Sequence, residues 1–110
     1  MVFEPPRLGE VEQLVLLAML RLEGDAYAVP IRDLIEQETG IALARGSIYI
    51  TLDRLEQKGL VESTMSEPTP EPGGKSRRVF RMRPVGLAAL RAARRAVDRL
   101  AAGTLLGRKT

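Results

Sequence analysis

Residues 46–63 read GSIYITLDRLEQKGLVES, and their pattern predicts a helix that passes into a strand with almost no loop between them. Ile48, Leu52 and Leu55 stand at i, i+4 and i+7, so they share one stripe of the helix and should be buried. The opposite stripe should face outward, and it consists of Ser47, Ile50, Arg54 and Gln57. Gly59 follows where a helix end favours a left-handed residue, and extended apolar residues come directly after it.

Two further helices are predicted upstream of this stretch. Residues 8–24 are apolar around more than half of the helix, so this first helix should be buried against more than one neighbour. A second helix is expected from Asp25, as its N-cap, to Thr39, and Gly40 should end it. Pro30 is tolerable because amides in the first turn have no helical acceptor.

Short strands are expected around the residue 46–63 helix. A minimal strand is predicted at residues 41–43, and a hairpin is predicted from residues 61–65 and 79–82. Residues 67–78, EPTPEPGGKSRR, are rich in proline and glycine, which predicts a mobile hairpin tip. Such a loop can lack any role, but the basic cluster at its return edge favours one: Lys75, Arg77 and Arg78.

The last predicted helix follows Pro84, which should stop the second strand of the hairpin. Its apolar residues alternate at spacings of three and four, typical of a helix that packs along another helix: Leu87, Leu90, Ala93, Val97 and Leu100. Its other side is basic, with Arg91, Arg94, Arg95 and Arg99. The apolar side predicts a homodimer interface, although the helix could instead fold back on its own core.

The composition excludes several classes of function. The chain has 110 residues, enough for one domain, and contains neither cysteine nor histidine. Disulfides, thiolate or imidazole metal sites and imidazole catalysis are therefore excluded, and we expect no metal and no cofactor. The carboxylates are spaced as solvated helix faces, and no nucleophile stands with a base, so we do not expect an enzyme.

Charge is distributed unevenly along the chain. Residues 1–74 carry 6 basic and 13 acidic side chains, whereas residues 75–110 carry 11 basic and 1 acidic. This C-terminal cluster could attract a polyanion or could simply be a solvated helix face. No apolar run approaches the roughly 20 residues that cross a bilayer, and the N-terminus does not resemble a signal peptide, so we expect a cytoplasmic protein without membrane contact.

The order of these elements is that of a winged helix-turn-helix with an added C-terminal helix, a mainly α fold with a small β-hairpin. Residues 1–83 should form the DNA-binding domain and residues 84–106 a dimerisation helix within the same compact unit. In this architecture the recognition helix enters the major groove by its N-terminal half, and the hairpin lies against the DNA backbone or minor groove.

At this point the sequence resembles the PadR-like transcriptional regulators, especially short members with a single C-terminal helix. The matching segments are LGEVEQLVLLAMLRL, DAYAVPIRDLIEQETG, GSIYITLDRLEQKGLVES and EPTPEPGGKSRRVFRMRPVGLAAL. The resemblance implies a homodimeric, usually repressing, DNA-binding protein that dimerises through its C-terminal helix. The chain departs from the family at Ala28, often glycine, and at Pro30, and its C-terminal helix lacks the aromatic residues with which some members stack planar ligands.

The expected partner is double-stranded DNA, and the residues expected to contact it are Arg45, Ser47, Tyr49, Ile50, Thr51, Arg54, Lys75, Arg77 and Arg78. Tyr49 could bind a phosphate, as the resemblance favours, or lean on the core. Arg54 could reach a guanine, a phosphate or only solvent, and Ile50 could meet a thymine methyl or be a neutral surface residue. The hairpin cations should add affinity that does not depend on sequence.

A dimer would place two recognition helices about 34 Å apart, which predicts a near-palindromic operator. The rival interpretation is a winged-helix protein–protein interaction module without DNA binding, because the N-terminal two-thirds of the chain is acidic. A small-molecule effector remains possible but unidentified, since its pocket would be lined by ordinary apolar side chains.

Overall fold

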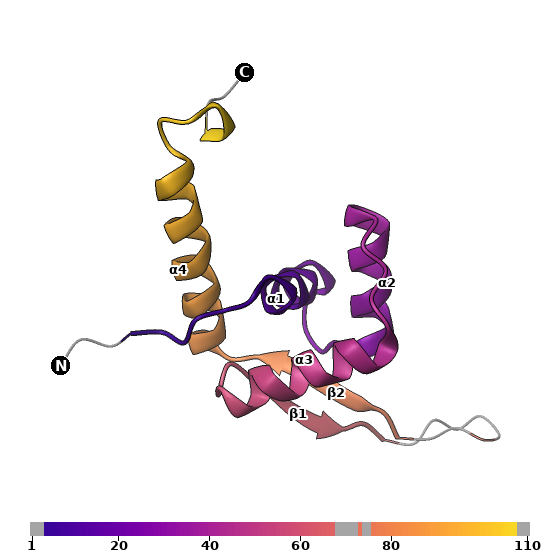
Figure 1. Ribbon diagram of the computed structural model, residues 1–110. Helices are drawn as coiled ribbons and strands as arrows, with labels where there is room; N and C mark the ends of the chain where they lie inside the picture. The colour runs from indigo at the N-terminus through magenta and orange to yellow at the C-terminus, as the bar shows by residue number, and fades with distance from the viewer. Residues whose placement is uncertain (1–3, 68–72, 74–75, 108–110) are drawn as a thin grey trace.

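Four helices and a hairpin share one apolar core in the computed structural model, which describes residues 4–67, 73 and 76–107 (Figure 1). The elements are α1 (Glu10–Leu22), α2 (Ala28–Thr39), α3 (Arg45–Gln57), β1 (Val61–Met65), β2 (Arg78–Met82), α4 (Pro84–Ala101) and a 3₁₀ turn, η1 (Leu105–Gly107). The predicted class, mainly α with a two-stranded antiparallel hairpin, is confirmed. Within these described residues, no helix combines the length and the apolar character needed to cross a membrane.

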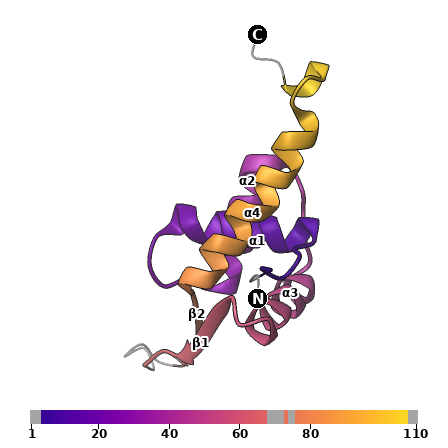
Figure 2. The same cartoon turned by 90° about the vertical axis from the view of Figure 1, so that its left-hand side faces the viewer.

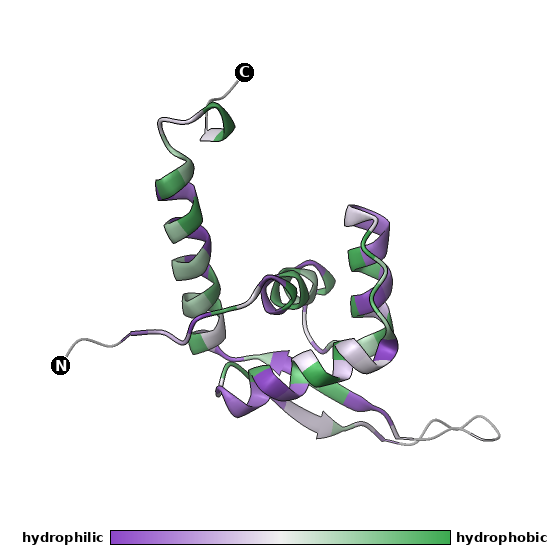
Figure 3. Cartoon of the chain, in the orientation of Figure 1, coloured by the Kyte–Doolittle hydropathy of each residue, from purple (hydrophilic) through white to green (hydrophobic). Residues whose placement is uncertain are grey.

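The helix α1 lies at the centre of the molecule and contacts α2, α3 and α4 (Figure 1). The apolar residues around most of α1 explain this position. Val15 and Leu16 are fully buried, and the partly buried Leu14 and Leu17 pack against the same core. Figure 3 shows the concentration of apolar residues along α1. Phe80 of β2 is also fully buried, so the hairpin is anchored in the core that the helices form.

The predicted buried stripe of α3 is confirmed, since Ile48, Leu52 and Leu55 are each 0% exposed. The helix ends at Gln57 with Lys58 as its C-cap, and Gly59 adopts the left-handed conformation with φ 76°. The amide of Leu60 donates to the carbonyl of Leu55 at 2.9 Å, which closes the last turn and directs the chain into β1.

The predicted start of the second helix was wrong. Tyr27, not Asp25, is the N-cap of α2, and the Asp25 carboxylate instead accepts hydrogen bonds from Arg81 at 2.8 and 3.0 Å. Ala26 and Phe80 exchange two backbone hydrogen bonds of 2.9 and 2.7 Å. Ala26 therefore pairs with β2 before the helix begins at Ala28.

This pairing also corrects the strand predicted at residues 41–43, which form no regular secondary structure. The edge of β2 is occupied by Ala26, so the link between α2 and α3 has no neighbouring strand to pair with. Gly40 does end α2 as predicted, in the left-handed conformation with φ 76°.

The hairpin pairs β1 with β2 in register from Val61 opposite Met82 to Met65 opposite Arg78. One further backbone bond, from the amide of Ser66 to the carbonyl of Arg77 at 2.7 Å, extends the ladder toward the tip. Most of the predicted mobile tip lies outside the described residues. We call this hairpin, with its connecting residues, the wing.

The helix α4 begins in the core and then leaves it. Pro84 is its first residue, and a Cβ on Gly86 would lie 2.3 Å from the carbonyl oxygen of Leu60, so only glycine permits this close approach. Ala89 and Leu90 are buried, but Val97 and Leu100 are 60% and 85% exposed. Figure 2 shows α4 passing across α1 and projecting beyond the rest of the molecule.

Candidate nucleic-acid interface

The outward face of α3 presents a mixed polar and apolar surface. Ser47, Arg54 and Gln57 are exposed as predicted, and Ile50, which lies among them, is 55% exposed. Because the buried stripe of α3 is fixed in the core, this face cannot rotate inward. A rigid helix with a solvent-facing row of this kind has the geometry needed to enter a major groove.

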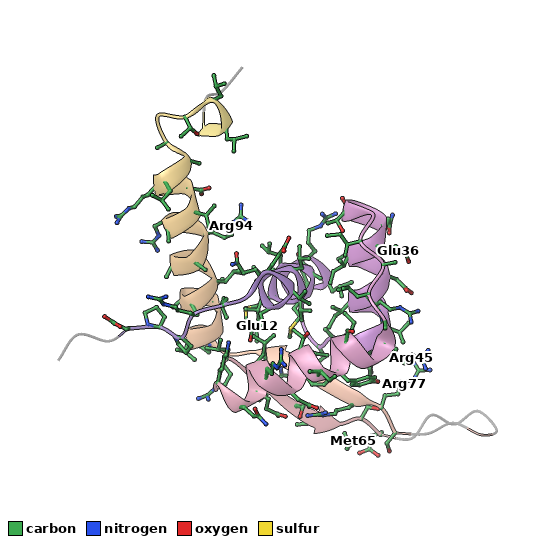
Figure 4. The ribbon with its side chains drawn as sticks, in the orientation of Figure 1. Glu12, Glu36, Arg45, Met65, Arg77 and Arg94 are labelled. Atoms are coloured by element: carbon green, nitrogen blue, oxygen red, sulfur yellow. The ribbon has the colours of Figure 1, made fainter. Side chains whose placement is uncertain are left out.

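A polar cleft of about 420 Å³ lies between the N-terminal ends of α2 and α3 and the return edge of the wing. Its lining residues are Tyr27, Ala28, Val29, Pro30, Arg45, Tyr49, Ser76, Arg77 and Arg78. Arg45 and Arg77 are labelled in Figure 4, where they lie close to each other beside the start of α3. The cleft thus gathers cationic and hydroxyl groups that are far apart in the sequence.

Tyr27 is a cleft residue that the sequence did not single out. The Arg77 guanidinium carbon lies 5.9 Å from the centroid of the Tyr27 ring, so the two side chains are stacked in a cation–π arrangement. The signal that could have found Tyr27 is its position directly before a helix, as the N-cap of α2. Its closeness to Arg77 depends on the fold, because 49 residues of chain separate them.

Tyr49 is 37% exposed and lines the same cleft. Both roles predicted for Tyr49 are compatible with this position. Arg45 and Ser47, in the first turn of α3, are exposed beside it. Ser47 does not cap the helix, since Ala44 occupies that position and no side chain caps it.

Thr51 does not belong to the outward face, which corrects the prediction for this residue. It is 6% exposed, and its hydroxyl donates to the Ser47 carbonyl at 2.8 Å. The side chain follows the buried stripe because it stands three residues after Ile48 and four before Leu55. Lys75, another predicted contact, lies outside the described residues.

Arg78, another predicted contact, has its guanidinium engaged within the protein. It forms ion pairs of 2.7 Å with Asp53 and with Glu56 of α3, and it lies over the Phe80 ring at 4.8 Å. A hydrogen bond from Ser63, together with the Arg78 pair, holds the pKa of the Glu56 carboxyl below its ordinary value.

A second ionic contact fixes the C-terminal end of α3. Lys58 forms an ion pair of 2.7 Å with the carboxylate of Glu12, a buried side chain of α1 that also accepts the amide of Gly9 at 2.8 Å. Lys58 additionally donates to the carbonyl of Arg7 at 2.9 Å. The C-terminal part of α3 is therefore held by two sets of charged contacts, in addition to the apolar stripe of the helix.

The residues predicted for a dimer interface fall into two groups along α4. Leu90 is 2% exposed and is occupied in the core of its own protomer, which corrects its assignment to an interface. Leu87 and Ala93 are half-buried, and Val97 and Leu100 are exposed. Within the predicted interface, the exposed residues that a partner could cover are therefore those near the C-terminal end of α4, Val97 and Leu100.

Comparison with known proteins identifies the family. Residues 16–92 match the family described as the transcriptional regulator PadR-like family. The chain belongs to this family. A curated relative, the transcriptional regulator Rv3488 of Mycobacterium tuberculosis, is 41% identical over 68 residues, which are 62% of this chain and 60% of that protein. The chain thus spans about 60% of the length of that relative, and the family to which it belongs is one of transcriptional regulators.

Solved structures confirm the winged-helix fold of this PadR-like regulator. A PadR family regulator from Eggerthella lenta is 27% identical, with a TM-score of 0.65 over 86% of this chain and 81% of that one. A transcriptional regulator from Clostridium thermocellum is 24% identical, with a TM-score of 0.68 over 82% of each chain. Bacillus subtilis PadR, solved in complex with operator DNA, is 18% identical, with a TM-score of 0.61 over 76% of this chain and 46% of that one.

Proposed function

We propose that this PadR-like regulator is a homodimeric repressor in which each protomer places α3 in the major groove of one half of a near-palindromic operator. The observation that carries the proposal is the outward row of Ser47, Ile50 and Arg54 next to the basic cleft at the start of the same helix. A regulator of this kind would act on chromosomal DNA in the cytoplasm, and a dimer on adjacent major grooves would block access of RNA polymerase to a promoter.

The cleft gives the recognition helix a fixed register on the DNA backbone. Guanidinium groups and tyrosine hydroxyls are common ligands of phosphate oxygens, and Arg45, Arg77, Tyr27 and Tyr49 supply both kinds. A phosphate bound here would lie between α3 and the wing, so the N-terminal half of α3 would be directed into the adjacent groove. Base contacts would then fall to Ile50 and Arg54 on the outward face.

The shape of the protomer supports dimerisation through α4. The radius of gyration is 16.0 Å, whereas a compact chain of this length has about 13 Å, and α4 is one of the elements that project from the core (Figure 1). The projecting segment exposes Val97, Leu100, Leu105 and Leu106, the last at 92%. Apolar side chains of this size gain free energy when a partner removes them from water.

The proposal is tested by fluorescence anisotropy titration of labelled duplexes with the full chain at two salt concentrations. One duplex carries the DNA directly upstream of the protein's own coding region, and the other carries a shuffled sequence of the same composition. We expect tighter binding to the upstream duplex and weaker binding at higher salt, with a symmetric footprint. Binding to neither duplex at low salt would instead support the protein–protein interaction module.

Substitution of the cleft arginines then tests the assigned surface. We expect the double variant Arg45→Gln/Arg77→Gln to reduce the slope of log affinity against log salt by about 0.9 for each phosphate that is no longer bound. The matched control is Arg21→Gln/Arg32→Gln, which removes an exposed cation from α1 and a half-buried one from α2, both outside the cleft. An equal reduction of the slope in the control would contradict the assignment of the cleft to phosphate.

A further inference from the structure

We propose that Arg78 is a positioning residue that latches the wing to the recognition helix, rather than a ligand of DNA phosphate. This inference rests on the proposed function, because it concerns how the two DNA-contacting parts are held relative to each other. Arg78 and Arg77 are neighbours in sequence, yet their side chains have different surroundings. Arg77 stacks on Tyr27 of the open cleft, and Arg78 turns to α3.

Every nitrogen of the Arg78 guanidinium has a partner within the protein. One terminal nitrogen lies 2.7 Å from Asp53, the other donates to Glu56 at 2.7 Å, and Nε donates to the Ser63 hydroxyl at 3.3 Å. The face of the group is covered by the Phe80 ring at 4.8 Å. These interactions use three of the five N–H groups, one on each nitrogen, so a phosphate that took the same N–H groups would have to displace Asp53, Glu56 or Ser63.

The interactions form a closed ring that joins α3 to both strands of the wing. The Ser63 hydroxyl of β1 donates to Glu56 at 2.6 Å and accepts from Arg78 of β2. Arg78 pairs with Met65 at the outer end of the ladder, whereas Phe80 anchors the inner part of the hairpin in the core. The ring thus restrains the wing at the point where the two strands leave the body of the protein.

The ring also controls charge beside the DNA-facing surface. Asp53 lies directly before the exposed Arg54, and its side chain is 50% exposed. Two carboxylates at this edge would repel a DNA backbone, and Arg78 offsets part of their charge while keeping them away from the outward row. Arg78 therefore acts by holding the wing against α3 and by offsetting the charge of the Asp53 and Glu56 carboxylates, without contact with the DNA.

A mutant cycle distinguishes a latch from a phosphate ligand. Operator affinity is measured for Arg78→Gln in the wild-type background and in the background of Asp53→Asn/Glu56→Gln. A latch predicts a loss of about tenfold in the wild-type background and less than about twofold in the double variant, because the carboxylates needed for the latch are already absent. Equal losses in the two backgrounds would overturn the proposal.

The variant Arg78→Lys provides a second test that does not remove the charge. A lysine ammonium cannot reproduce the forked contact with two carboxylates, so a latch predicts a loss close to that of Arg78→Gln. Retention of wild-type affinity by Arg78→Lys would indicate a simple charge contact and would overturn the latch. Thermal unfolding of each variant by circular dichroism establishes that the fold persists.

A distance measurement without DNA separates this inference from the proposed function. The chain has no cysteine, so Ala44→Cys/Met65→Cys can carry two spin labels, one at the exposed start of α3 and one on the wing. We expect Arg78→Gln to broaden the distance distribution in double electron–electron resonance, and the neighbouring Arg77→Gln to leave it narrow. An unchanged distribution in Arg78→Gln would reject the latch even if the wild type binds DNA, and a broadened one would support it even if the wild type does not.

Discussion

The helices α3 and α4 both place one face in the same core, but they leave different faces exposed. On α3 the exposed row is Ser47, Ile50 and Arg54, in which polar residues flank one isoleucine. The later part of α4 exposes Val97 and Leu100 at 60% and 85%. Figure 3 shows this contrast in the apolar colouring that continues along α4 after it leaves the core.

These two surfaces imply partners of different chemistry. A mainly polar face is stable in water and can later exchange its water for the polar edges and phosphates of a nucleic acid. An apolar face on a projecting helix gains free energy only when another apolar surface covers it. One short chain thus provides one surface suited to DNA and another suited to a second copy of itself.

The largest effect should come from the buried side of α3. We expect Leu52→Ala to lower the free energy of unfolding by about 2–5 kcal/mol, because it leaves a cavity at a fully buried position. Urea denaturation measures the change. The matched control is Ile50→Ala on the exposed side of the same helix, which should alter stability by no more than about 0.5 kcal/mol. Similar losses in both variants would mean that α3 does not have two distinct faces.

The control variant also addresses specificity. If Ile50 contacts a thymine methyl, Ile50→Ala should reduce discrimination at one base pair of each operator half-site, measured by competition with single-base operator variants. Unchanged discrimination at every position would leave Ile50 as a neutral surface residue.

The next effect concerns the exposed side of α4. We expect Val97→Glu/Leu100→Glu to convert the dimer to a monomer and to weaken operator binding about 100-fold, since one linked molecule would no longer bind both half-sites. Sedimentation equilibrium measures the first effect and anisotropy the second. The control Arg95→Glu/Arg99→Glu adds negative charge on the other side of the helix and should remain dimeric. A dimeric Val97→Glu/Leu100→Glu would contradict the assigned interface.

A smaller effect is expected where α4 leaves the core. Glycine to alanine normally stabilises a helix, but at Gly86 the added Cβ would meet the Leu60 carbonyl oxygen at 2.3 Å. We therefore expect Gly86→Ala to lower the free energy of unfolding by about 1–3 kcal/mol, measured by thermal or urea denaturation. An increase in stability would show that α4 can shift away from Leu60 at little cost.

The smallest effect is a dependence on pH at the edge of α3. Because the pKa of Glu56 is lower in the folded state than its ordinary value, its contribution to stability is present above about pH 4.3 and is lost as the pH falls through the folded-state pKa. Glu56→Gln should therefore make the free energy of unfolding less dependent on pH in the acid range. Glu36→Gln, which removes the same charge from the exposed surface of α2, is the control. A pH dependence identical to that of the wild type in Glu56→Gln would contradict the ion-pair ring.

Much of the architecture could be predicted locally. The stripe of α3, the turn at Gly59, the bounds of β1 and the start of α4 at a proline follow from periodicity and from the conformations that glycine and proline allow. The errors at Asp25 and at residues 41–43 share one cause. The segment that pairs with the outer edge of β2 is determined by long-range contacts, and in this fold that segment is Ala26.

The surroundings of the individual side chains proposed to face DNA were less predictable than the helix that carries most of them. Helical phase indicated the outward positions of Arg54 and Gln57, but Thr51 lies close to the boundary between the two faces and is buried. For Arg78, the sequence showed a cation near a loop and could not show the carboxylates of α3 beside it. Leu90 was similarly ambiguous, because an apolar residue on α4 can serve the core or an interface.

The sequence by itself determined most of the helices and both strands of the hairpin, which side of α3 is apolar, and which family the chain resembles. The secondary structure and the apolar side of α3 depend on contacts between residues a few positions apart. The family depends on sequence motifs that are continuous in the chain. Only the tertiary structure decided that Arg77 faces an open cleft while Arg78 is held by Asp53 and Glu56, and where α4 leaves the core. The physical reason is that the charge and apolar area of a side chain are local properties, whereas its availability depends on which distant groups the fold brings against it.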